Sequence, residues 1–236
     1  MELRRVTTGL AVGFVTVGMT LLAAEQNQKP TVEIPKPGVP QIMTIEGEYV
    51  RIAYNNEGFV TLGYRVVNES VGQEWALLEI GTTVRQGVPN YMLKRDALSI
   101  ETPDGKTIPL ASNDEFLKVN LDGLQNRANV MRDSIDYFPN GTTQACRIGF
   151  FAELNQPSRD WDQVELSSRR ACLGRIYFHI PGGIKYGQHW LNVKFQKSLV
   201  RVPFRVFTAE EKKTLSKNYG DIRKQVQEAM NPKKGN

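Results

Sequence analysis

The stretch that decides the fold is Gly174–Phe207, GRIYFHIPGGIKYGQHWLNVKFQKSLVRVPFRVF. Three segments of it alternate apolar and polar residues, with the apolar positions at Ile176, Phe178 and Ile180, at Leu191, Val193 and Phe195, and at Val200, Val202, Phe204 and Val206. A period of two is typical of strands that turn one face toward a core. The turn-forming runs 181–183 and 196–198 separate the segments. We therefore predict a three-stranded antiparallel meander here.

The same alternation recurs earlier in the chain. Residues 50–54 and 60–66 predict a hairpin around the turn 55–58, and residues 97–100 and 106–110 predict a second one around 102–105. The more continuously apolar run 75–80 predicts a central strand. Residues 113–140 instead show helical spacing of their apolar positions and predict one or two short helices. The fold class expected is mainly β, an antiparallel β-sandwich with a helical insertion.

The segment Gly187–Phe195, GQHWLNVKF, is similar to the late strands of immunoglobulin-like sandwiches, with His189 at the place of their usual tyrosine. The resemblance covers about thirty residues closely and the remainder only through strand rhythm. It implies an immunoglobulin-like sandwich and implies no activity, because one fold hosts many functions.

The N-terminus predicts export. Two arginines among residues 1–5 precede an uncharged, mostly apolar run at 6–24 and then a polar run, the pattern of a signal peptide. The apolar run is also long enough to cross a bilayer, so cleavage after Ala24 and a retained membrane anchor both stay open. Residues 25–43 are a proline-rich linker, residues 44–207 the sandwich with its insertion at 113–140, and residues 208–236 a helix with a basic tail. The exported chain is expected to be periplasmic, extracellular or membrane-anchored and facing outward.

The two cysteines support this location. Cys146 is in phase with the apolar residues of 146–154, and Cys172 is in phase with Ile176. An even number of cysteines in an oxidising compartment favours a disulfide, although two buried free thiols remain an alternative. We predict a Cys146–Cys172 bond.

The C-terminal segment predicts an amphipathic helix. Thr208 and Glu211 have the spacing of a capping box. One apolar stripe follows, made of Leu215, Tyr219, Ile222, Val226 and Met230. The stripe either docks on the parent domain or binds a protein partner or a membrane surface.

The sequence offers little material for catalysis. Motifs of serine hydrolases, phosphate-binding loops, zinc proteases and dinucleotide-binding folds are missing, and only two histidines occur. By strand parity His179 and His189 point to opposite faces, which disfavours a metal site between them. The carboxylates at Asp133 and Asp136, and at Asp160 and Asp162 near Asn155, are too few for a recognised calcium loop. Aromatic residues at loops or wet faces, as candidates for sugar or protein contact, are Phe59, Trp161, Tyr177 and Trp190.

Charge narrows the range of partners. The formal net charge is +5, and its excess lies in residues 208–236 rather than in basic blocks with interleaved aromatics. We expect no nucleic acid, no cofactor, no metal and no enzymatic activity. The expected function is protein–protein contact at a cell envelope, with membrane contact open to the N-terminal segment. The alternative is a carrier of a small ligand, a glycan or a metal.

Overall fold

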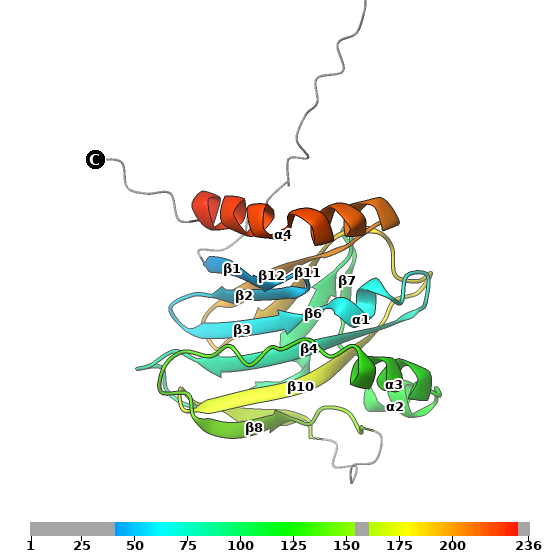
Figure 1. Ribbon diagram of the computed structural model, residues 1–236. Coiled ribbons are helices and arrows are strands. Elements are labelled where there is room, and N and C mark those ends of the chain that lie inside the picture. Colours follow the sequence, from blue (N-terminus) through cyan, green and yellow to red (C-terminus); the bar gives the residue numbers. More distant parts are fainter. Residues whose placement is uncertain (1–40, 154–160, 231–236) are drawn as a thin grey trace, which may run out of the picture. The chain divides into compact units, whose positions relative to one another are not determined.

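The computed structural model describes residues 41–153 and 161–230. The predicted signal or anchor segment and most of the linker lie outside these residues. The described chain is mainly β, and its strands form a β-sandwich of one six-stranded and one four-stranded sheet, beside a small two-stranded one (Figure 1).

The six-stranded sheet has the order β1-β2-β3-β4-β10-β8, from β1 (Ile42–Gly47), β2 (Val50–Tyr54), β3 (Gly58–Gly63), β4 (Trp75–Val84), β10 (Arg170–His179) and β8 (Gln144–Ile148). The four-stranded sheet has the order β12-β11-β6-β7, from β12 (Leu199–Val206), β11 (Gly187–Lys194), β6 (Leu98–Glu101) and β7 (Thr107–Pro109). The small sheet pairs β5 (Tyr91–Lys94) with β9 (Gln163–Leu166). Neighbouring strands are antiparallel except β10 and β8, which are parallel.

The helices lie outside the sheets. They are α1 (Arg65–Asn68), the 3-10 turn η1 (Arg95–Ala97), α2 (Asn113–Leu117), α3 (Asp122–Val130) and α4 (Ala209–Met230). The capping box predicted at the start of α4 is present, and a second capping box begins α2. Both explain where their helices begin, because each satisfies two backbone N–H groups. In Figure 1, α4 lies along the edge where β1 and β12 end the two large sheets. Helix α4 therefore covers an edge that would otherwise be exposed.

The core lies between the two large sheets. Ile176, Phe178, Leu191, Val193 and Val202 are all buried, which confirms the alternation read from Gly174–Phe207. The outer face of the six-stranded sheet is covered as well, by residues 131–138, which cross it without regular secondary structure. Thr61 donates its hydroxyl to the Tyr137 carbonyl oxygen (2.9 Å), and Gly63 and Gly81 leave the space that this crossing segment needs.

The predicted meander is wrong at its first connection. Strand β10 pairs with β4 and β8, whereas β11 pairs with β12 and β6 in the other sheet. The connection between them crosses from sheet to sheet and is held by two backbone hydrogen bonds of Ile184, to Gly72 and to Gln73 (2.9 Å each). Alternation indicates which face of a strand is buried and does not indicate which strand lies beside it. The predicted pairing of β10 with β11 is wrong for this reason.

Smaller differences concern boundaries. The first strand begins at Ile42, inside the predicted linker, and the strand predicted at 60–66 ends at Gly63. Val66 and Val67 are buried from α1 instead, because the chain turns there to bring Asn68 against β12. The hairpins, the central position of β4, the helices within 113–140 and the helix from 209 are confirmed.

Candidate functional site

A cleft of about 1000 Å³ opens at one end of the sandwich. Three connections meet there, those between β2 and β3, between β4 and β5, and between β11 and β12, together with the start of β1. The lining residues that matter below are Ile42, Tyr54, Glu57, Arg85, Val88, Lys197 and Leu199. Loops at the end of a rigid sandwich are a common place for recognition, because they change without disturbing the core.

The β2–β3 turn is fixed by its own sequence. The Asn55 side-chain oxygen accepts hydrogen bonds from the N–H groups of Glu57 (2.9 Å) and Gly58 (2.8 Å). A Cβ at Gly58 would stand 2.2 Å from the ring of Phe195, so only glycine allows this strand to approach β11 so closely. The turn is therefore rigid, and it is joined to the opposite sheet.

Glu57 joins this turn to the β11–β12 turn. Its carboxylate accepts hydrogen bonds from the Lys197 N–H (3.0 Å) and from the Ser198 hydroxyl (2.6 Å). The side chain is buried, and both of its oxygens are used. Glu57 is thus a structural anchor of the cleft, and its carboxylate is hydrogen-bonded within the domain.

Two cationic side chains line the cleft without an acidic partner among the residues that the structure describes. The Arg85 guanidinium lies over the ring of Tyr54, 5.0 Å from its centroid, and the Tyr54 ring stacks on Phe59. Within the described residues, neither Arg85 nor Lys197 forms a salt bridge. Arg85 is half-buried and held in place by the aromatic ring, so it presents a pre-oriented positive charge.

A second group of charges lies away from the cleft, on the outer face of the six-stranded sheet. Asp133 accepts from the Arg65 side chain (2.9 Å), and the Asp133 N–H donates to Glu79 (3.2 Å), which Arg175 also approaches (3.6 Å). Burial raises the pKa of the Glu79 and Asp133 carboxyl groups, and the hydrogen bonds and the arginines oppose that rise. The network fastens the crossing segment 131–138 to the sheet, and none of its residues lines the cleft.

His189 is buried inside the sandwich. Its Nδ1 lies 3.1 Å from the Gly187 carbonyl oxygen, and its Nε2 has no hydrogen-bond partner within the described residues. Burial lowers the pKa of its imidazole to about 4, so the ring is neutral at physiological pH. His179 lies in the other sheet, near Glu74, so the two histidines are apart because their strands do not pair, and not for the reason of strand parity within one hairpin.

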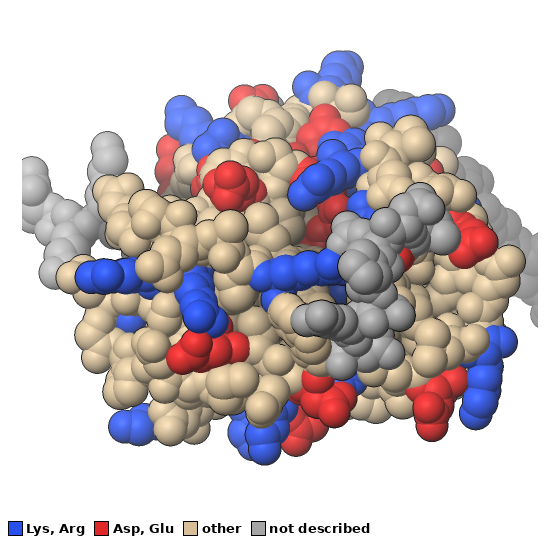
Figure 2. All heavy atoms as spheres, turned by 90° about the horizontal axis from the view of Figure 1, so that it is seen from below, with Lys and Arg blue, Asp and Glu red and all other residues tan. Residues whose placement is uncertain are grey.

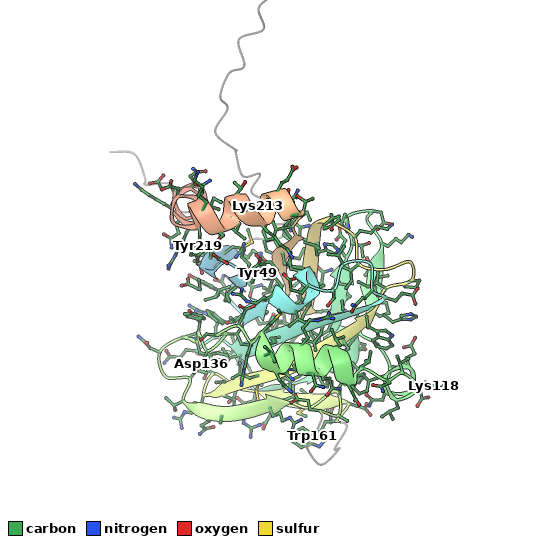
Figure 3. The ribbon with its side chains drawn as sticks, turned by 45° about the vertical axis from the view of Figure 1, so that its right-hand side comes forward. Tyr49, Lys118, Asp136, Trp161, Lys213 and Tyr219 are labelled. Atoms are coloured by element: carbon green, nitrogen blue, oxygen red, sulfur yellow. A yellow bond between two sulfur atoms is a disulfide. The ribbon has the colours of Figure 1, made fainter. Side chains whose placement is uncertain are left out.

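The predicted apolar stripe of α4 faces the domain over its first half. Leu215 is buried, and Tyr219 and Ile222 are half-buried and pack against the core. Figure 3 shows Tyr219 on the side of α4 that faces the strands, and Arg223 pairs with Glu46 of β1 (3.2 Å). The side chains of Val226 and Met230 lie outside the described ones.

The other sequence candidates do not form a site. Phe59 and Tyr177 are buried, and Trp190 is half-buried and contacts the Arg201 guanidinium at 4.5 Å. Trp161 is exposed on the side of the domain away from α4 (Figure 3). Asn155 and Asp160 lie outside the described residues, and within the described ranges no group of three or more histidine, cysteine, aspartate or glutamate side chains is arranged to hold a metal.

The predicted disulfide is present. Cys146 of β8 and Cys172 of β10 stand directly opposite each other in the parallel pair and are bonded. The bond joins the last strand of the six-stranded sheet to its neighbour. Such a bond is typical of an oxidising, exported environment.

The face of the domain opposite α4 does not offer a surface of one charge. Figure 2 shows lysine and arginine side chains interspersed there with aspartate and glutamate over a mostly uncharged surface. Interspersed charges of both signs give only a weak field at a distance, and so the cleft is the more specific candidate.

Sequence reasoning found the turns of the cleft and missed the cleft itself. Residues 55–58 and 196–198 were read as turns, but nothing in their composition indicates that they meet. Arg85 directly follows the last residue of β4. The one feature of the sequence that could have indicated it is a charged residue placed after a long apolar strand and shortly before Gly87.

Comparison of the chain with protein-family models, with curated proteins and with solved structures found no match. No helix among the described residues has the length and apolar character needed to span a membrane.

Proposed function

We propose that the protein is a non-catalytic, exported β-sandwich that acts through protein–protein contact at the cell envelope, with the cleft as its contact site. The observation that carries the proposal is the pair Arg85 and Lys197 beside the apolar residues Ile42 and Val88. A positive charge held next to apolar surface favours a partner that offers both an acidic and an apolar group.

The absence of catalysis is supported by where the perturbed groups lie. The buried ionisable groups with shifted pKa values include Glu79, Asp133 and His189, and none of them lines the cleft. Catalytic groups need both a shifted pKa and access to a substrate. Glu79 and Asp133 also have a structural explanation in the network that fastens the crossing segment.

Two features of different kinds support the location. The Cys146–Cys172 bond fits an oxidising compartment, and residues 1–24 have the pattern of a signal peptide or anchor. A chain that retains this segment would hold the sandwich at the outer surface of a membrane, where its cleft meets other envelope proteins.

Photo-crosslinking in the cells that produce the protein tests the proposal. A photoreactive residue at Asn56, which lines the cleft, is expected to give discrete crosslinked products, and the same residue at Lys118 in the α2–α3 turn is the control. Arg85→Glu with Lys197→Glu should remove the Asn56 products. Identical products from both positions, or products that survive the double charge reversal, would show that the cleft is not the contact site.

A carrier of a small ligand is the second candidate, because the volume of the cleft suits ligands of that size. Two observations weigh against a glycan or a metal. The Tyr54 ring already contacts Phe59 and Arg85, and the described residues hold no metal-binding cluster. Calorimetric titration with neutral sugars, uronates and divalent metals decides: saturable heat that disappears in Arg85→Gln would support the carrier.

A further inference from the structure

The outer edge of β12 is covered position by position. Gln41 pairs its side-chain amide with both backbone groups of Arg201, donating to the carbonyl oxygen and accepting from the N–H (2.8 Å). Further along the edge, the Asn68 side-chain amide donates to the Arg205 carbonyl oxygen (3.0 Å) and accepts from the N–H of Phe207, which follows the end of β12 (2.8 Å). Between these positions stands Pro203, which has no N–H to offer. Side-chain amides and one proline thus block most of an edge that would otherwise accept another strand.

Within the part of the chain that the structure describes, Leu199 is the exception on this edge. In an antiparallel pair, alternate residues direct both backbone groups toward the partner strand or away from it. Arg201 directs its groups to Gln41, away from β11, and Leu199 lies two residues earlier in the same phase, opposite Lys194. The bond from the Phe195 N–H to the Ser198 carbonyl oxygen (2.7 Å) closes the hairpin in the same register. The N–H and C=O of Leu199 therefore point outward, and Leu199 lines the cleft.

The edge position that no described residue covers and the two cations without a described acidic partner belong to the same cleft. Arg85 and Lys197 line it together with Leu199, and Glu57, the one carboxylate among the described lining residues, is already hydrogen-bonded to the β11–β12 turn. Ile42, 40 % exposed, and Val88 supply apolar contacts. Backbone donors and acceptors, a positive charge and an apolar wall are the three elements that bind a peptide at a sheet edge.

We propose that the cleft binds an extended, acidic segment of another protein, which adds to the edge of β12 at Leu199 and directs carboxylates to Arg85 and Lys197. This inference rests on the proposed function and specifies the partner of the same site. Side chains of an extended segment alternate, so acidic residues at every second position can face the cations while the residues between them meet Ile42 and Val88. The caps on Arg201 and Arg205 limit the added strand to the first residues of β12.

The test uses the exported chain and a fluorescein-labelled eight-residue peptide of alternating glutamate and valine, followed by fluorescence anisotropy. A peptide with lysine in place of glutamate is the charge control. The glutamate peptide is expected to bind and the lysine peptide is not. Arg85→Gln should weaken binding about tenfold, because it removes a charge-assisted hydrogen bond. Equal binding of the two peptides would overturn the acidic specificity.

Main-chain pairing is tested separately, by Leu199→Pro. The substitution removes the outward N–H, and β12 already accepts proline at Pro203 in the same phase, so the melting temperature should hold. Binding should fall about fivefold, the effect of one lost hydrogen bond. Leu199→Ala, which keeps the N–H, is the matched control and should lose less binding than Leu199→Pro, because the pairing uses the backbone. Unchanged binding in Leu199→Pro would overturn the edge pairing.

A peptide N-methylated at alternate residues gives the same answer without a change in the protein, and its failure to bind is the expected result. The outcomes separate the inference from the function on which it rests. Loss of peptide binding together with intact crosslinking at Asn56 would discard the acidic strand and keep the protein-contact function. Loss of crosslinking at Asn56 would discard both.

Discussion

The imidazole of His189 stacks on the ring of Phe204, with the ring centroids 5.1 Å apart and the planes 22° from parallel. The two residues stand opposite each other on β11 and β12, and both are buried between the sheets. An ionisable ring in this position links the stability of the sandwich to pH.

Stability should therefore fall in mild acid because of His189. Its pKa is about 4 in the folded chain and about 6.5 when unfolded, so between these values the unfolded state binds the proton and the folded state does not. The free energy of unfolding should decrease by about 3 kcal/mol in all as the pH falls from about 6.5 to about 4. Below about pH 4, His189 should cause no further decrease. Urea denaturation of the native chain and of His189→Gln across this range measures it. The other ionisable groups titrate alike in the native chain and in His189→Gln. Parallel profiles of stability against pH would therefore contradict the assignment of the loss to His189.

Phe204 should be one of the more sensitive core positions. It is 2 % exposed and contacts His189 and Tyr64, so Phe204→Ala should cost about 3 to 5 kcal/mol by leaving a cavity between the sheets.

Phe59 is the comparison for this prediction. By strand parity alone, Phe59→Ala should cost much less. The structure places Phe59 under Phe138 of the crossing segment, 7 % exposed, so we expect about 3 kcal/mol. Thermal melts of both variants decide, and a negligible loss in Phe59→Ala would mean that the crossing segment does not cover the sheet in solution.

Asn68 should be more important than its type suggests. Its buried amide serves Arg205 and Phe207, so Asn68→Ala should leave a part-buried carbonyl and a buried N–H without partners and cost about 2 to 4 kcal/mol. Gln41→Ala is the control, since this half-buried edge can recruit water and should lose about 1 kcal/mol or less. Chemical denaturation of the two variants measures the difference. Equal losses would show that the two caps are energetically alike.

The disulfide should contribute about 3 to 4 kcal/mol, as expected for a bond that closes a loop of this length in the unfolded chain. Replacing Cys146 and Cys172 by serine should lower the denaturant midpoint by a matching amount, and dithiothreitol should lower that of the native chain alone. A reductant-sensitive midpoint in the double-serine variant would point to a different cause.

Among the features predicted from sequence, those that succeeded are local. Alternation in β10, β11 and β12 marked the buried residues correctly, because a strand places its side chains on two faces whatever lies beside it. Thr208 and Glu211 marked the start of α4, because a capping box needs contacts across only three residues. Cys146 and Cys172 were paired correctly since only one pairing exists.

What the tertiary structure alone decided is which distant segments meet. The sequence placed β10 beside β11, and the fold separates them into two sheets, because strand pairing depends on the whole arrangement rather than on a strand's own pattern. Likewise Gln41 and Asn68 look like ordinary polar residues until β12 lies beside them, and Arg85, Lys197 and Leu199 share a cleft only because three loops meet at one end of the sandwich. Local propensity acts over a few residues, whereas hydrogen-bond partners and the charges around a cleft are set by contacts between residues more than a hundred positions apart.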